Sequence, residues 1–313
     1  MILFLGMFAA LDGVLGSVDA WLGAVWAGLL SSRIVYWDML EAYVSGIAFA
    51  VWIMGYRLLD QVPYFHKYRF EKDRVDPVPL FQPDPNNSWV PLALYLLAIH
   101  VFHAIFPKPP LNEEPPTALR LCIELIVGFV VYDFIFFWIH LGMHKFPSLA
   151  HIHKHHVHHT QTVLTASEVQ HHSGVDGSLQ VIVNIMVQNI VLPHFGKKHL
   201  LSKLLHNIII TYMLTEIHAG YDGFWSLHNI FPWFYGGAKR HEEHHKGGHA
   251  HFQQFFLYLD FLLETCNTSA VLLKHLVREL YIDVPAVTKK CSSDMIRWGS
   301  CAAVVLVSVY CCL

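Results

Sequence analysis

Histidine is the residue type in this chain most able to do chemistry. The sequence of 313 residues contains 24 histidines, and 20 of them lie between His140 and His251. Within that stretch the pattern H-x-x-H-H occurs twice. At this histidine frequency, chance predicts the pattern about 0.14 times in a chain of this length. The spacing of the histidines is therefore a signal in its own right.

The histidines form three groups whose spacing fits one face of a helix. Residues at i, i+3 and i+4 lie on the same side of a helix, with Cβ atoms about 5 to 6 Å apart. In chain order the groups are His140 and His144; His155, His158 and His159; and His241, His244 and His245. The sequence thus predicts eight imidazoles presented from helical faces.

The middle group can be read in more than one register. Three further histidines lie within or beside it and offer alternative ligands: His151, His153 and His156. We prefer the register that begins at His155, because it alone gives H-x-x-H-H. His171 and His172 are further candidate ligands, although surface positions are favoured for both.

Metal binding explains these groups better than a purely structural role. A buried imidazole N–H without a partner costs about 1 to 3 kcal/mol, so eight clustered imidazoles would cost about as much as the stability of a whole domain. Neutral imidazole suits zinc, copper, iron or nickel, and no cysteine lies between His140 and His251. Eight ligands exceed the needs of one ion. We therefore expect two ions with open positions for dioxygen or water.

Nearby carboxylates are candidates for orienting the imidazoles. Asp133 lies two helical turns before His140, so its carboxylate could accept a hydrogen bond from a ligand's second nitrogen. Pairing of this acid with a group elsewhere in the membrane region is an equally good reading. Glu242 and Glu243, between ligands of the third group, are expected to face water.

Composition indicates that lipid surrounds much of the chain. Hydrophobic residues make up 54% and charged residues 14%, whereas an average soluble domain has about 25% charged residues. The net charge of −3 provides no basic field for a polyanion, so a nucleic-acid partner is excluded.

Several segments are long and apolar enough to cross a bilayer, which takes about 17 to 25 residues. The strongest candidates are Ile34–Tyr56, Trp89–Phe106 and Leu121–Ile139, and weaker ones are Met1–Leu30, Leu179–Leu192 and Leu200–Ile217. The first of the weaker segments lacks the cationic start of a signal peptide, so we expect it to be retained. The run Trp298–Leu313 is a marginal anchor.

Loop charges predict the orientation of these segments. Five cations follow the Ile34 segment, and only Lys108 and Arg120 lie in the next connection. By the positive-inside rule the histidine groups then face the cytosol. Lys197 and Lys198 do not fit this scheme, because they lie at the turn between the last two apolar segments. That hairpin is therefore expected to dip into the bilayer without crossing it.

The fold class expected is all-α, because no run of strict polar and apolar alternation is long enough for a strand. We expect polytopic membrane helices with a cytosol-facing, helical, histidine-rich core that holds two metal ions. The predicted regions are residues 1–119, embedded in the membrane; 120–266, the catalytic domain; and 267–313, a tail with a possible short anchor.

The motifs together resemble those of the fatty acid hydroxylase/sterol desaturase superfamily. The resemblance covers about residues 120–266. It is carried by Tyr132-Asp-Phe-Ile-Phe-Phe-Trp-Ile-His140-Leu-Gly-Met-His144, the run ending in His158-His159, His218-Ala-Gly-Tyr-Asp222, and His241-Glu-Glu-His244-His245. By this resemblance, the eight histidines of the three groups and His218 are the metal ligands, and no catalytic residue is expected outside the metal centre.

The resemblance implies a multi-pass enzyme of the endoplasmic reticulum membrane, of the sterol desaturase or C-4 methylsterol oxidase kind. Such an enzyme has two iron ions and uses dioxygen as a co-substrate. Electrons come from NAD(P)H through a separate carrier, either cytochrome b5 or a reductase. The reaction hydroxylates or desaturates a C–H bond of a sterol, fatty acid or sphingolipid. The iron and the dioxygen supply the difficult chemistry.

Two other functions remain open. A hydrolytic or isomerising relative is one, since bound metal also activates water. A histidine-rich metal transporter or metal-buffering membrane protein is the other. Loops that gather cations need no helical register, whereas all three histidine groups keep one, and this favours the oxidase.

Overall fold

The computed structural model describes residues 2–71, 90–105, 111, 114–153, 165–170, 173–247 and 250–264. The chain divides into two compact units, residues 1–256 and 257–313. In the second unit residues 258–264 are helical. The histidine-bearing helices of the described chain all lie in the first unit. The predicted region boundaries near residues 120 and 266 stay predictions.

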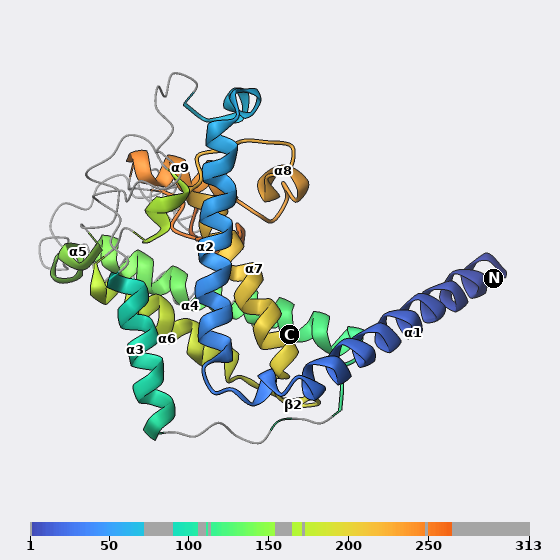
Figure 1. The fold of residues 1–313 in the computed structure, drawn as a ribbon. Coiled ribbons are helices and arrows are strands. Elements are labelled where there is room, and N and C mark those ends of the chain that lie inside the picture. The colour runs from blue at the N-terminus through green and yellow to red at the C-terminus, as the bar shows by residue number, and fades with distance from the viewer. Residues whose placement is uncertain are drawn as a thin grey trace, which may run out of the picture. The chain divides into compact units, whose positions relative to one another are not determined.

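The described part is mostly helical with little strand, which confirms the all-α prediction (Figure 1). Its α-helices are α1 (Ile2–Ser31), α2 (Leu40–Gln61), α3 (Val90–Ile105), α4 (Ala118–Lys145), α5 (Pro147–His153), α6 (Gly174–Gln188), α7 (Leu200–His218), α8 (Leu227–Ile230) and α9 (Gly237–Gly247). Short 3-10 turns are η1 (Ile34–Tyr36), η2 (Pro63–Tyr68) and η4 (Ala166–Gln170). A small antiparallel hairpin pairs β1 (Val191–Leu192) with β2 (Gly196–Lys197).

Local sequence signals set the ends of the two helices that matter most for the site. The side chain of Thr117 caps α4 by accepting a hydrogen bond from the Arg120 N–H, and Pro147 follows directly after its C-terminal cap. His199 caps α7 through its ring nitrogen. Gly220 ends that helix in the left-handed conformation, with φ of 71°, which glycine adopts without steric cost.

Within the described parts of the chain, three helices are long and apolar enough to cross a membrane: residues Gly13–Ser31 of α1, all of α2 and all of α4. The predicted boundaries of the second were wrong. It begins at Leu40, because Arg33 has φ of 60° and η1 interrupts the chain, and it ends at Gln61, just before Pro63.

Three of the other predicted spans are shorter than expected or lie outside the described residues. Helix α3 has 16 residues, about 24 Å of rise against a hydrocarbon core of about 30 Å. Leu179–Leu192 is not one helix, because α6 ends at Gln188 and β1 follows. The run Trp298–Leu313 lies outside the described residues.

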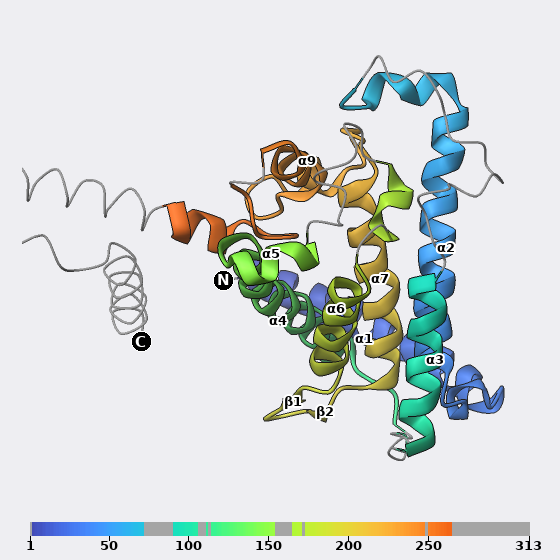
Figure 2. The ribbon, with the colours of Figure 1, turned by 90° about the vertical axis from the view of Figure 1, so that its left-hand side faces the viewer.

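Helix α7 is the central element of the unit. Both views show α2 and α7 side by side, while α4 runs across them in Figure 1 and is seen nearly end-on in Figure 2. Helix α9 packs against α7. This arrangement brings the histidine-bearing helices α4, α7 and α9 together.

One apolar core lies between these helices and α6. Its buried members include Tyr132, Phe136, Val183, Val187, Ile210, Met213, Leu214, Ile217 and Phe255. Each side chain of this size contributes about 1.5 to 3 kcal/mol when it is fully buried. The core therefore fixes α4 against α7, and with them the histidines that these helices carry.

A buried ion pair holds the segment that follows α7. The Arg69 guanidinium lies 2.7 Å from an Asp60 carboxylate oxygen, and the Tyr221 hydroxyl donates to the same oxygen at 2.8 Å. Breaking such a pair by removing one partner costs about 3 to 5 kcal/mol. This contact ties the end of α2 to the chain just after His218.

Candidate metal centre

Seven histidines of the described chain gather into two largely buried clusters. Cluster 1 comprises His140, His144, His153 and His244, and cluster 2 comprises His218, His241 and His245. Within each cluster the potential ligand atoms all lie within 4.8 Å of one another. Helix α9 contributes to both clusters. Its H-x-x-H-H motif is divided, because His241 and His245 turn toward α7 while His244 turns toward α4.

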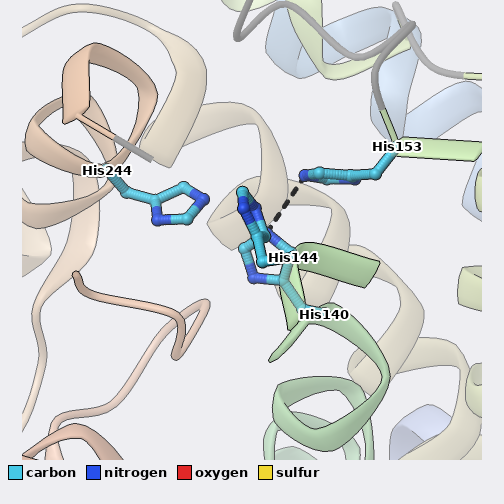
Figure 3. Close-up of side chains that lie close together, drawn as sticks. All are labelled: His140, His144, His153 and His244. Atoms are coloured by element: carbon cyan, nitrogen blue, oxygen red, sulfur yellow. Dashed lines mark hydrogen bonds between the residues drawn. The ribbon is translucent and has the colours of Figure 1, made fainter. Parts of the chain in front are cut away.

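Hydrogen bonds at Nδ1 orient three of the four rings of cluster 1. His140 donates to the Phe252 carbonyl at 2.7 Å, and His244 donates to the Ala250 carbonyl at 2.7 Å. His153 donates to the Asp176 carboxylate at 3.0 Å. Figure 3 shows the four rings converging. Because a neutral imidazole carries one N–H, each of these three rings has its lone pair on Nε2.

Two of these lone pairs face each other. The Nε2 atoms of His140 and His153 are 3.2 Å apart (Figure 3, dashed line). Both rings already donate from Nδ1 to groups that only accept, so two neutral rings have no proton to place between their Nε2 atoms. A cation bound by both nitrogens would resolve this conflict. The donor set of cluster 1 therefore fits a metal ion.

Cluster 2 has the same character. His218 donates from Nδ1 to the Leu214 carbonyl, one turn back in α7, at 2.8 Å. Its Nε2 lies 3.0 Å from Nε2 of His241, which lies 2.9 Å from Nε2 of His245. Imidazole binds ions such as zinc at about 2.0 to 2.1 Å, so two ligands at right angles have nitrogens about 3 Å apart. The spacing in both clusters matches this value.

Burial keeps the His244 ring in the form that binds metal. Burial lowers the pKa of His244 to about 4. The hydrogen bond to the Ala250 carbonyl opposes this shift, and the neighbouring His153 adds to it. The ring is therefore neutral at pH 7, as metal ligation requires.

Both clusters line one small enclosed cavity. Its walls come from cluster 1 (His140, His153), cluster 2 (His218, His241) and the side chains Phe136, Val169, Asp176, Gln180 and Gln254. The volume of about 10 Å³ has room for roughly one water-sized molecule. The side-chain carbonyl oxygen of Gln254 is buried and has no hydrogen-bond partner among the described residues.

The structure places six of the nine predicted ligands in these clusters: His140, His144, His218, His241, His244 and His245. The preferred middle group, His155 with His158 and His159, lies outside the described residues, as do His156, His171 and His172. His153, which belonged only to an alternative register, lies in cluster 1. No helical spacing marked it; its signal is the contact with Asp176, which is distant in sequence.

Two expectations for acidic residues meet different outcomes. Glu242 does not face water: it is buried and pairs with the Lys246 ammonium at 3.0 Å. Asp133 is fully buried and accepts hydrogen bonds from the backbone N–H groups of Phe255 and Phe256. Of the two readings of Asp133, these contacts support pairing elsewhere in the chain.

The amino-acid sequence is similar to those of known proteins. The profile of the fatty acid hydroxylase family matches residues 125–265. A cholesterol 25-hydroxylase-like protein of Caenorhabditis briggsae is 30% identical over 220 residues, which cover 68% of this chain and 70% of the relative. The chain belongs to the fatty acid hydroxylase/sterol desaturase superfamily.

Other family members are more distant but cover as much. A C-4 methylsterol oxidase of Candida albicans is 26% identical over 68% of this chain and 69% of its own length. Human cholesterol 25-hydroxylase is 24% identical over 79% of this chain and 88% of its own length. No solved structure matches the chain significantly. Both histidine clusters lie inside the stretch that matches the family profile.

Proposed function

We propose that this protein is a membrane-bound oxidase that uses dioxygen and two iron ions to hydroxylate or desaturate a C–H bond of a lipid. The observation that carries the proposal is the pair of histidine clusters facing one cavity. Seven imidazoles from four helices form the two clusters, and four of them line the cavity. A cysteine-free, all-imidazole set suits iron among the metals compatible with it. Bound iron would supply the activation of dioxygen.

The chain's own residues hold and shield this centre. Cluster 1 would hold one ion and cluster 2 the other. Asp176 orients His153 so that its Nε2 can bind the ion of cluster 1. Phe136 and Val169 give the cavity apolar walls, which exclude water and so protect reactive species from side reactions.

A sterol is the favoured substrate class, and fatty acids and sphingolipids remain the alternatives. Several relatives are named for cholesterol or methylsterols. The apolar helices α2 and α4 both pack against α7, which carries His218. Helix α4 also carries His140 and His144 of cluster 1. A lipid could therefore approach the centre from the bilayer.

The electron supply and the location are further parts of the proposal. Electrons would come from NAD(P)H through cytochrome b5 or a reductase, at the cytosolic face of the endoplasmic reticulum. The three candidate spans support a membrane location. Four cations that follow α2 support the orientation by the positive-inside rule: Lys67, Arg69, Lys72 and Arg74.

The test is turnover by purified, iron-loaded protein with NADPH, cytochrome b5, its reductase and a sterol under ¹⁸O₂. Hydroxylation predicts a product that carries one ¹⁸O atom, and desaturation predicts the loss of two hydrogens. The His244→Ala variant should give no product. Stoichiometric zinc with no turnover dependent on reductant would overturn the proposal and favour the metal-buffering alternative, in which His244→Ala only weakens binding.

A further inference from the structure

Asp133 lies in the middle of the apolar helix α4, where a charged group is costly. Its side chain is fully buried. The carboxylate accepts hydrogen bonds from the Gln253 side-chain amide at 2.6 Å, from the Phe255 N–H at 2.9 Å and from the Phe256 N–H at 3.2 Å. All three donors belong to one short segment, residues 250–256, which we term the strap.

The strap also contacts cluster 1. Its Ala250 carbonyl accepts from His244 Nδ1 and its Phe252 carbonyl accepts from His140 Nδ1, both at 2.7 Å. One end of the strap therefore fixes two candidate ligands, while the other end is fixed by Asp133. The Phe255 carbonyl adds a bond from the Gly236 N–H at 2.8 Å, just before α9.

The strap does not hold its shape by its own preference. His251 lies between the two carbonyls with φ of 59°, a conformation that costs a non-glycine residue about 1 to 3 kcal/mol. Outside contacts must maintain it. The Asp133 carboxylate supplies three of them, and Phe255, which is fully buried, stacks on Tyr132 with ring centroids 5.8 Å apart.

Cluster 2 has a different support. The Nδ1 atom of His218 donates within its own helix, to Leu214. The strap carbonyls of Ala250 and Phe252, by contrast, accept from ligands of cluster 1. A change at Asp133 should therefore act on one cluster and leave the other intact.

We infer that Asp133 is a positioning residue for cluster 1, acting through the strap on the orientation and tautomer of His140 and His244. The inference rests on the proposed metal centre. Loss of partners that orient a ligand typically lowers metal affinity about 10- to 100-fold. Asp133→Asn should therefore weaken metal binding at cluster 1 by about this factor and leave cluster 2 unchanged.

The experiment is an anaerobic Co²⁺ titration of the metal-free, full-length protein, followed by visible absorption. Wild type should show two binding steps, and His244→Ala identifies the step that belongs to cluster 1. Asp133→Asn should weaken that step alone. The control is Glu124→Gln. Glu124 is another buried acid of α4, whose carboxylate pairs with Arg120 and the His199 N–H, so this variant should titrate like wild type.

Unchanged steps in Asp133→Asn, or equal weakening of both, would overturn the inference. If this variant does not fold, Gln253→Leu removes one of the three donors and should weaken the same step to a smaller degree; an unchanged titration then overturns the inference. Because Co²⁺ binding needs no turnover, a wild type that binds two ions but oxidises no lipid would refute the proposed function and leave the inference standing.

Discussion

His244 and His245 are adjacent in sequence but serve different clusters, with ring planes at 90° and ring centroids 6.1 Å apart. Helix geometry explains the division, because neighbouring residues on a helix point about 100° apart. Helix α9 therefore lies between the two clusters and links them. The family motif H-x-x-H-H is, in this chain, a pair of ligands for one site and a single ligand for the other.

This division predicts that alanine substitutions at the two positions have separate effects on metal binding. His244→Ala should weaken metal binding at cluster 1, and His245→Ala should weaken metal binding at cluster 2. Either variant should abolish turnover because both ions are needed. Metal titration of each variant measures this. The control is His100→Ala, which removes an exposed histidine of α3. Loss of the same binding step in both variants would contradict the division.

Asp176 should control metal affinity through His153. Its carboxylate is buried and accepts from His153 Nδ1 at 3.0 Å, so Asp176→Asn should lower affinity at cluster 1 about 10- to 100-fold. The matched control is Asp222→Asn, which alters a second Asp–His contact, to His228 at 2.9 Å, outside both clusters. Equal metal affinity in Asp176→Asn and wild type would show that His153 needs no such partner.

The Gln254 side chain should lower the stability of the fold while supporting turnover. Its carbonyl oxygen is buried and has no hydrogen-bond partner in the described part of the chain, which costs about 1 to 3 kcal/mol in the folded protein. Gln254→Leu should therefore leave the thermal stability of the metal-free protein equal or higher. Turnover should fall, because the amide no longer offers a hydrogen-bond acceptor to a molecule in the cavity. Thermal unfolding and product formation are measured on the same preparation. A variant with lower stability and full turnover would contradict this role.

His228 should make stability depend on pH. Burial of the ring opposes its charged form, but the carboxylates of Glu216 and Asp222 outweigh burial and raise the pKa of His228 above the ordinary value. The charged ring therefore stabilises the fold fully below about pH 6.5, and this contribution is lost as pH rises through the raised pKa.

The measurement is the difference in melting temperature between wild type and His228→Asn. The variant should melt lower at about pH 6, and the gap should narrow toward about pH 9. A gap that widens with pH would show that the ring is held neutral instead.

The sequence predicted those parts of the molecule that depend on local spacing. Apolar length predicted α2 and α4, and helical spacing predicted that His140 and His144 point the same way. It also predicted one shared face for His241, His244 and His245, and this was wrong for His244, which joins the other cluster. It could not predict which cluster each ligand joins, because that depends on how α4, α7 and α9 cross.

Contacts between distant segments were also beyond the sequence. His153 reaches cluster 1 at the end of a short helix and is fixed by Asp176, 23 residues later. Glu242 was expected in water because it lies between ligands, but Lys246 pairs with it one turn on. The contacts of Asp133 with a segment 120 residues away leave no periodic trace.

The most direct test of the account is the metal content of protein purified without added metal, measured by mass spectrometry together with Mössbauer spectroscopy. The account predicts about two iron ions per chain, each ligated by imidazole nitrogen, and dioxygen uptake when reductant and a sterol are added. Stoichiometric zinc, with no uptake of dioxygen under those conditions, would contradict it.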